Sequence, residues 1–260
     1  MKEKPLILVT NDDGISAPGL IHLTAIASRF GRVVVVAPDK PQSGMGHAIT
    51  INSTLRLHET NYHNAELEYA CTGTPVDCVK MAVNHLLNEK PDLVLSGINH
   101  GSNSSINVIY SGTMSAAVEG ALEGAKSIGF SLCDYSLHAD FSQATVFLEQ
   151  IIEHTLNNPM PKGVCLNVNI PKLQLNQIKG IKVVRQANAI WYERFDERQD
   201  PYGRNYYWLT GEFINHEKDA TDTDEWALNN NYISVVPVHT DLTAHFALQQ
   251  LKSMENEFKN

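Results

Sequence analysis

The sequence predicts an α/β fold, with a doubly wound, mostly parallel sheet followed by a β-rich C-terminal extension. Short apolar runs alternate with segments of helical periodicity up to about residue 170, as expected for repeated strand–helix–strand units. The first unit, residues 6–37, contains a crossover long enough to imply parallel pairing. After Gly180 the alternation stops and the chain becomes polar and aromatic. We therefore expect a core at residues 1–180 and an extension at residues 181–260.

The elements of the first unit follow from local patterns. Residues 6–10 form a short apolar run that stops at Asn-Asp-Asp-Gly, as a buried strand ending in a loop would. Apolar residues recur at helical spacing over residues 18–30, and Gly31 follows as a helix stop. Residues 32–37 contain four consecutive valines and predict a second buried strand.

The rest of the core continues this alternation. Residues 48–57 and 66–71 alternate apolar and polar side chains and predict a hairpin. Thr74-Pro75-Val76-Asp77 has the pattern of a capping box with proline at the first helical position, opening a helix to about residue 87. The remaining expected elements are strands at 92–96, 128–133 and 163–170, and helices at 113–126 and 142–156.

The extension is distinguished by its aromatic residues. Residues 187–231 hold nine of the 20 Phe, Tyr and Trp residues in the chain. Aromatic enrichment is typical of protein interfaces, so we expect this arm to make a subunit contact. The alternative is a β-excursion that packs on its own domain. A strand at 232–238 and an amphipathic helix at 242–254 are expected to follow.

Composition limits the classes of partner. The chain has 20 Lys and Arg against 29 Asp and Glu, a net charge of −9, which argues against a nucleic-acid duplex or an anionic membrane as partner. An anionic substrate would instead need local attraction, for which a divalent metal is the obvious candidate. The four cysteines form no CxxC pair, and no apolar run reaches membrane length. We expect a cytoplasmic protein.

Oxygen-rich loops follow three of the predicted strands. Asp12 and Asp13 leave the first strand together, Ser43 lies in the second loop and Asn99 in the third. These loops meet at one edge of a parallel sheet, and hard divalent cations prefer such carboxylate, hydroxyl and amide oxygens. The alternative is that Asn-Asp-Asp-Gly only makes a turn. Convergence of the three loops favours a Mg²⁺ or Mn²⁺ site.

A second feature is the start of the helix expected near residue 113. Ser111-Gly112-Thr113-Met114-Ser115 would present backbone N–H groups, hydroxyls and a positive dipole end to a phosphate, and Gly112 would allow close approach. A helix cap without ligand is the alternative. His47 and His100 lie in the same loops as candidate acids or bases, or as surface residues.

Five motifs together resemble one family. They are Ile7–Gly14, Val36–Asp39 with Gln42–Gly44, Thr72–Val79, Ser96–Asn103 and Tyr110–Thr113. In this order and at these spacings they closely resemble the stationary-phase survival protein SurE family. The resemblance is nearly continuous over residues 6–130 and weaker after residue 180.

The resemblance implies a Rossmann-like fold and a metal-dependent phosphatase that acts on nucleoside 5′-monophosphates, with some 3′-nucleotide and polyphosphate activity. It places metal ligands at Asp12, Asp13, Ser43 and Asn99, the set that the loops indicate. It also implies homodimers or homotetramers that exchange the C-terminal extension.

The reaction expected is hydrolysis of a phosphomonoester by a water that the metal activates, with Asp12 and Asp13 as catalytic residues. Direct attack by Asp12 on phosphorus is an alternative. Expected phosphate ligands are Asn103, Ser111, Gly112, Thr113 and Ser115, and expected supporting residues are Asn11, Gly44 and His100. A metal-dependent nucleotidyl or glycosyl transferase and a non-catalytic nucleotide-binding oligomer are the rival functions.

Overall fold

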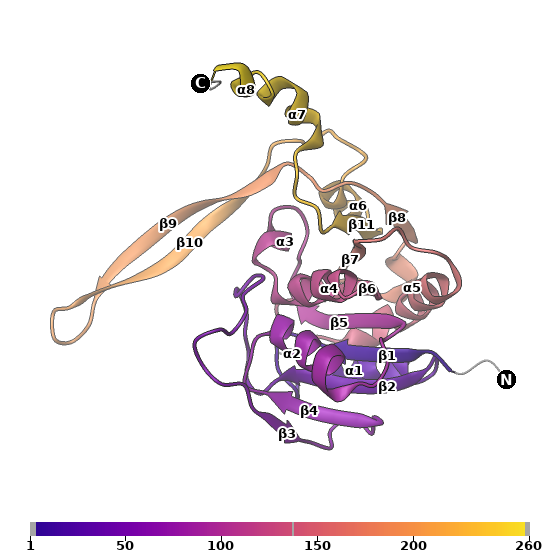
Figure 1. The fold of residues 1–260 in the computed structure, drawn as a ribbon. Coiled ribbons are helices and arrows are strands. Elements are labelled where there is room, and N and C mark those ends of the chain that lie inside the picture. Colours follow the sequence, from indigo (N-terminus) through magenta and orange to yellow (C-terminus); the bar gives the residue numbers. More distant parts are fainter. Residues whose placement is uncertain (1–3, 137, 258–260) are drawn as a thin grey trace.

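The computed structural model describes residues 4–136 and 138–257, and it confirms the α/β prediction (Figure 1). One sheet has nine strands in the order β3-β4-β2-β1-β5-β6-β7-β11-β8. Its strands are β1 (Leu6–Thr10), β2 (Arg32–Pro38), β3 (Leu57–Glu59), β4 (Leu67–Cys71), β5 (Leu93–His100), β6 (Lys126–Leu132), β7 (Val164–Ile170), β8 (Ile181–Val183) and β11 (Ile233–His239). The helices are α1 (Pro18–Ala27), α2 (Pro75–Met81), α3 (Asn107–Tyr110), α4 (Gly112–Leu122), α5 (Thr145–Asn157), α6 (Asp224–Asn229), α7 (His245–Leu251) and α8 (Met254–Glu257).

The sheet has a switch point beside β1. From β1 the chain crosses to β2 on one side, continues to β4, and then returns to β5 on the other side of β1. The six strands from β4 to β7 run parallel to one another. In such sheets ligands bind beyond the carboxyl ends of the strands at the switch point. The loops after β1, β2 and β5 all leave from that edge.

Helices cover both faces of the sheet. Leu20 and Leu23 of α1 and Leu148 of α5 belong to one apolar core, whereas Val79 of α2 and Ala116 of α4 belong to the other. The valines of β2 alternate between the two cores because successive strand side chains point to opposite faces. Burial on both faces explains the unbroken apolar run in β2.

The expected elements are present, with one clear difference. Thr74 and Asp77 form the predicted capping box, with Pro75 in the first turn of α2. The predicted hairpin partner at residues 48–57 is wrong, because only β3 pairs antiparallel with β4 and no strand is formed between residues 48 and 56. Strand β4 instead pairs parallel with β2 and extends the main sheet. Alternating polarity at 48–57 indicated exposure on one side, but did not specify strand pairing.

The extension contributes to the main sheet and also leaves it. Strands β8 and β11 continue the sheet beyond β7, and β11 runs antiparallel to β7. Strands β9 (Ala189–Gln199) and β10 (Asn205–Asn215) form a separate antiparallel hairpin that projects from the body (Figure 1). The helix expected at 242–254 is divided into α7 and α8. The division at residue 180 stays a prediction, and the two parts share one sheet.

No helix in the described part of the chain combines the length and apolar character needed to cross a lipid bilayer.

Candidate active site

The turn after β1 brings two adjacent carboxylates to the switch point. The side chain of Asn11 accepts a hydrogen bond from Gly14 N at 3.2 Å and donates one to Gly14 O at 3.1 Å. Gly14 has φ +102°, a backbone conformation that other residues rarely adopt. Asn11 therefore closes the turn, and this releases Asp12 and Asp13 from the alternating directions of a strand.

Asp12 lies against the beginning of α4. Thr113 Oγ1 donates a hydrogen bond to Asp12 Oδ1 at 2.6 Å. A Cβ at Gly112 would come within 2.7 Å of Asp12 Cβ, so glycine is required for this close approach. Burial raises the pKa of Asp12, and the Thr113 hydroxyl and the backbone N–H groups of Gly112 and Thr113 offset part of that rise. The start of α4 thus orients Asp12 and favours its negative charge.

The negative charge of Asp13 is only partly offset by neighbouring groups of the protein. Its Oδ2 atom is buried and has no hydrogen-bond partner among the described residues. Burial and the neighbouring Asp12 charge raise the pKa of Asp13 to about 6, although His100 partly offsets them. An unpartnered carboxylate oxygen beside a second carboxylate is the kind of site that a divalent cation neutralises.

The other two expected metal ligands are Ser43, in the loop after β2, and Asn99, near the end of β5. Gln42 N donates to Asp12 O at 2.7 Å, which ties the Ser43 loop to the Asp12 backbone. Ser43 is exposed, its side chain makes no hydrogen bond with the described residues, and Gly44 follows with φ +75°. Asn99 Nδ2 donates to Gly101 O at 3.0 Å, and its amide oxygen accepts no hydrogen bond from the described residues. Both side chains therefore retain an oxygen for a ligand.

The available donors fit a hard cation. Across residues 4–136 and 138–257 there is no cluster of three or more His, Cys, Asp or Glu side chains suited to a metal. A cation at the two aspartates would therefore be bound by hydroxyl and amide oxygens as well. This is the donor set of Mg²⁺ and Mn²⁺ sites rather than of a zinc site.

The expected phosphate ligands are less available than the sequence indicated. Ser111 Oγ accepts from Met114 N at 3.0 Å as the cap of α4, and Ser115 Oγ donates to Ser111 O at 2.7 Å. Asn103 is buried, and its Nδ2 atom donates to Ser131 Oγ at 2.8 Å. The side chains of these residues, like that of Thr113, already have partners within the fold. The first backbone N–H groups of α4 also have partners, those of Gly112 and Thr113 in Asp12 and that of Met114 in Ser111, so these phosphate roles stay predictions.

Two histidines have distinct surroundings. His100, at the end of β5, packs edge-on against Phe141, and its Nδ1 atom is buried without a hydrogen-bond partner in the described chain. His47 Nε2 lies 2.9 Å from Glu119 Oε2, and Lys80 pairs with the other carboxylate oxygen. These partners lower the pKa of Glu119 against the effect of burial.

Glu119 was missed in the sequence analysis. It is nearly fully buried, and its contact with His47 anchors the loop that carries Ser43 to α4. The available signal was a single acidic residue in the middle of a helix of otherwise small and apolar residues, Gly112–Leu122. A buried charge of this kind is retained only when it is paired.

The fold and the site together define a class: an α/β protein with a group of oxygen donors beside a helix N-terminus at the switch point of its sheet. Residues 7–193 match the family model described as Survival protein SurE, and the chain belongs to this family. A Flavobacterium johnsoniae protein named 5′-nucleotidase SurE is 63% identical over 252 residues, covering 96% of this chain and 97% of that protein. A Flavobacterium psychrophilum protein of the same name is 61% identical over 253 residues, covering 97% and 98%. The crystal structure of the SurE protein from Aquifex aeolicus has a TM-score of 0.84 and 40% identity, and covers 96% of this chain and 100% of that chain.

Proposed function

We propose that this protein is a divalent-metal-dependent 5′-nucleotidase that releases phosphate from nucleoside 5′-monophosphates, and also from 3′-nucleotides and short polyphosphate. The unpartnered Asp13 carboxylate beside Asp12, at the start of α4, carries the proposal. The full-length relatives named 5′-nucleotidase SurE support the choice of substrate.

The protein's own residues would prepare the site in two ways. Asp12, Asp13, Ser43 and Asn99 would hold Mg²⁺ or Mn²⁺, and Thr113 would keep Asp12 in its orientation. When bound, the cation would supply Lewis-acid stabilisation of phosphoryl oxygens and a lower pKa for an attacking water. The hydrogen bond from Gln42 to Asp12 and the contact of His47 with Glu119 would hold the Ser43 loop at both ends.

The positive end of α4 would face the phosphate. Helix α4 has 11 residues, and its first backbone N–H groups lie beside Asp12. Asp12 already accepts from these N–H groups, so the helix dipole would offset the negative charge that develops during phosphoryl transfer. A protein of net charge −9 would in this way attract an anion locally.

Phosphate release from a panel of nucleoside 5′- and 3′-monophosphates and short polyphosphate tests this proposal. We expect release in Mg²⁺ or Mn²⁺ and none in EDTA, because both carboxylates need the cation to act together. Transfer to an acceptor without free phosphate would instead indicate a transferase. Nucleotide binding without any turnover would indicate a binding protein.

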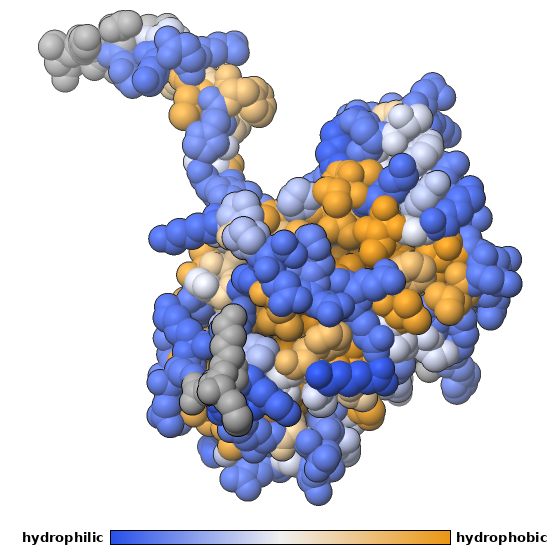
Figure 2. Space-filling model, turned by 90° about the vertical axis from the view of Figure 1, so that its right-hand side faces the viewer, coloured by the Kyte–Doolittle hydropathy of each residue, from blue (hydrophilic) through white to orange (hydrophobic). Residues whose placement is uncertain are grey.

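We also propose that the protein is a cytoplasmic homodimer or homotetramer formed through the extension. The hairpin of β9 and β10 exposes several aromatic side chains, and an isolated two-stranded hairpin is marginally stable in water. These side chains are Tyr192, Phe195, Tyr202, Tyr207 and Trp208. Figure 2 shows that apolar side chains also gather on the surface of the body. The four free cysteines agree with a reducing compartment.

Shortening the hairpin is expected to lower the oligomeric mass. Residues 193–211 would be replaced by Asn-Gly, because Tyr192 and Glu212 are cross-strand partners and this dipeptide suits a tight hairpin turn. The deletion keeps α6 and the root of the hairpin. Light scattering on the chromatographed protein measures the mass, and an unchanged mass would rule out assembly through the arm.

A further inference from the structure

A cavity of about 310 Å³ lies on the same edge of the sheet as the candidate active site. Its walls include Ser102 and Ser104 after β5, Tyr135 after β6 and Lys172 after β7. The cavity lies beyond the ends of β5, β6 and β7, and Ser102 in its wall follows Asn99 by three residues. A group joined to a phosphate through a sugar could therefore reach it from the active site.

An aromatic pair forms the outer wall of this cavity. Trp191 of β9 and Phe213 of β10 are cross-strand partners whose ring centroids are 5.4 Å apart. Trp191 remains 41% exposed, and its Nε1 atom donates to Asn107 Oδ1 at 2.7 Å. This hydrogen bond fixes the plane of the indole ring. Tyr135 forms part of the opposite side and lies directly over Gly101, two residues after Asn99.

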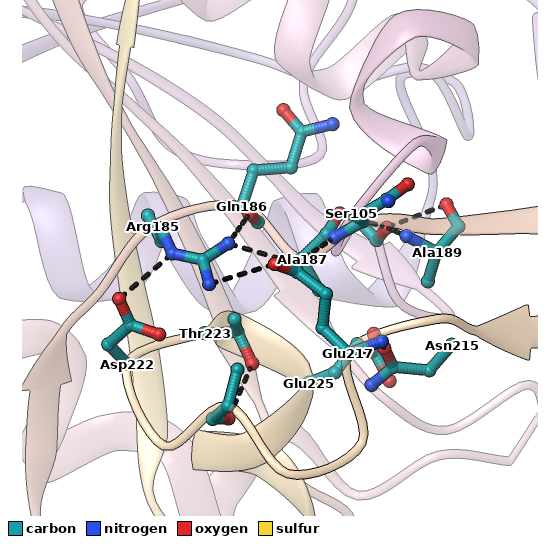
Figure 3. A network of polar contacts seen from close by, with 12 residues as sticks. Ser105, Arg185, Gln186, Ala187, Ala189, Asn215, Glu217, Asp222, Thr223 and Glu225 are labelled. Atoms are coloured by element: carbon teal, nitrogen blue, oxygen red, sulfur yellow. Dashed lines mark hydrogen bonds and ion pairs between the residues drawn. The ribbon is translucent and has the colours of Figure 1, made fainter.

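A network of polar contacts holds the root of the hairpin against the loop that follows β5 (Figure 3). Ser105 Oγ lies 2.9 Å from both Ala187 O and Ala189 O. Asp224 accepts hydrogen bonds from Ser105 N at 2.7 Å and Ala187 N at 2.9 Å. Trp191, two residues beyond Ala189, is therefore held in position relative to the loop that follows β5, the strand that carries Asn99.

The inner wall is polar. Ser104 Oγ donates to Glu225 Oε1 at 2.5 Å, and the second oxygen of Glu225 accepts no hydrogen bond from the described residues. Lys172 is paired with Asp134 at 2.9 Å. A flat ligand with a polar edge would meet an aromatic face on one side and a hydrogen-bond acceptor at its edge. Ligand sites for small aromatic molecules commonly combine these features.

We propose that this cavity binds the nucleobase of the nucleotide substrate, with Trp191 and Phe213 as its stacking surface. The inference rests on the proposed nucleotidase function and adds the part of the substrate that the switch-point residues do not contact. Stacking on an aromatic face depends little on which hydrogen-bond donors and acceptors a base carries, because every base has a π-face. The cavity therefore accepts several bases.

The test compares AMP with ribose 5-phosphate, which has the same phosphate and sugar but no base. In Trp191→Leu, which keeps apolar bulk and loses the aromatic face, we expect the ratio of kcat/KM for AMP to that for ribose 5-phosphate to fall about tenfold. Trp191→Phe, which keeps a ring, should retain most of the ratio. Tyr62→Leu is the matched control, since Tyr62 is an exposed aromatic residue outside the hairpin and does not line the cavity.

Calorimetric binding of adenosine separates this proposal from the proposed function. Adenosine has no phosphate, so its affinity measures binding at the cavity even if the wild type releases no phosphate from any substrate. Weaker adenosine binding in Trp191→Leu than in Trp191→Phe and Tyr62→Leu supports the base site. Equal adenosine affinity in all variants, or an unchanged ratio of AMP to ribose 5-phosphate in Trp191→Leu, would overturn it.

Discussion

Replacing Asp13 with asparagine is expected to lower metal-dependent phosphate release at least about a hundredfold while making the metal-free protein more stable. The loss of activity follows because Asp13 is proposed to bind the cation directly, and removing a direct ligand costs at least as much as the 10–100-fold loss typical of residues that only support the ligands. The gain in stability follows because Asp13 is ionised at neutral pH although burial and Asp12 both oppose its charge. Asparagine keeps the shape of the side chain and removes that charge.

The size of the stabilisation follows from the pKa. A rise in the pKa of Asp13 from 3.8 to about 6 corresponds to at most about 3 kcal/mol in the free energy of unfolding at pH 7.5. For a domain of this size, that is an increase of several degrees in melting temperature. Thermal unfolding in EDTA measures it, with Asp219→Asn as the control because Asp219 is exposed. A metal-free Asp13→Asn protein that melts below the wild type, or one that retains phosphate release, would contradict this account of the site.

The contribution of Asp13 to the stability of the metal-free protein, measured as the difference in melting temperature between the wild type and Asp13→Asn, is expected to fall as pH rises from about 4 to about 6. The folded-state pKa of Asp13 is raised from 3.8 to about 6, so the stability due to its protonated form is fully present below pH 3.8. That contribution is lost as pH rises through 6. Asp12, whose pKa burial also raises, acts in the same direction.

Mg²⁺ or Mn²⁺ should reverse this trend, because a cation favours the ionised carboxylates. Metal at about 100 times its dissociation constant would add about 2.7 kcal/mol to the free energy of unfolding at pH 7.5. The increase in melting temperature should be much smaller at pH 5, where protons compete with the cation. Sodium chloride of matched ionic strength is the control. An equal increase at both pH values, or with sodium chloride, would show that these aspartates do not bind the metal.

Much of the site could be predicted from the sequence because its determinants are local. Asn11 and Gly14 make a turn that depends on neighbouring residues alone, and the same is true of the capping box at Thr74 and Asp77. The meeting of the three loops also followed from the alternation of strands and helices, since parallel strands place their carboxyl ends together. The sequence could therefore indicate which loops meet, but not how each side chain in them is turned.

Asn103 and Thr113 illustrate the difference. Each has a side-chain donor that could bind a phosphate, yet Asn103 donates to Ser131 and Thr113 donates to Asp12. Their partners lie 28 and 101 residues away in the chain. A hydroxyl or amide can bond to a ligand or to the protein with similar energy, so only the distances in the folded chain decide between them.

By itself, the sequence determined the α/β class, the succession of strands and helices along the chain and the segments that carry the oxygen donors. Apolar periodicity and turn residues act over a few positions, and this makes them readable without a structure. The tertiary structure alone decided the pairing of β4 with β2, the burial of Glu119 beside His47 and the cavity bounded by Tyr135, Trp191 and Phe213. Each of these joins segments that are distant in the chain, and their contacts arise from packing of whole elements rather than from any local pattern.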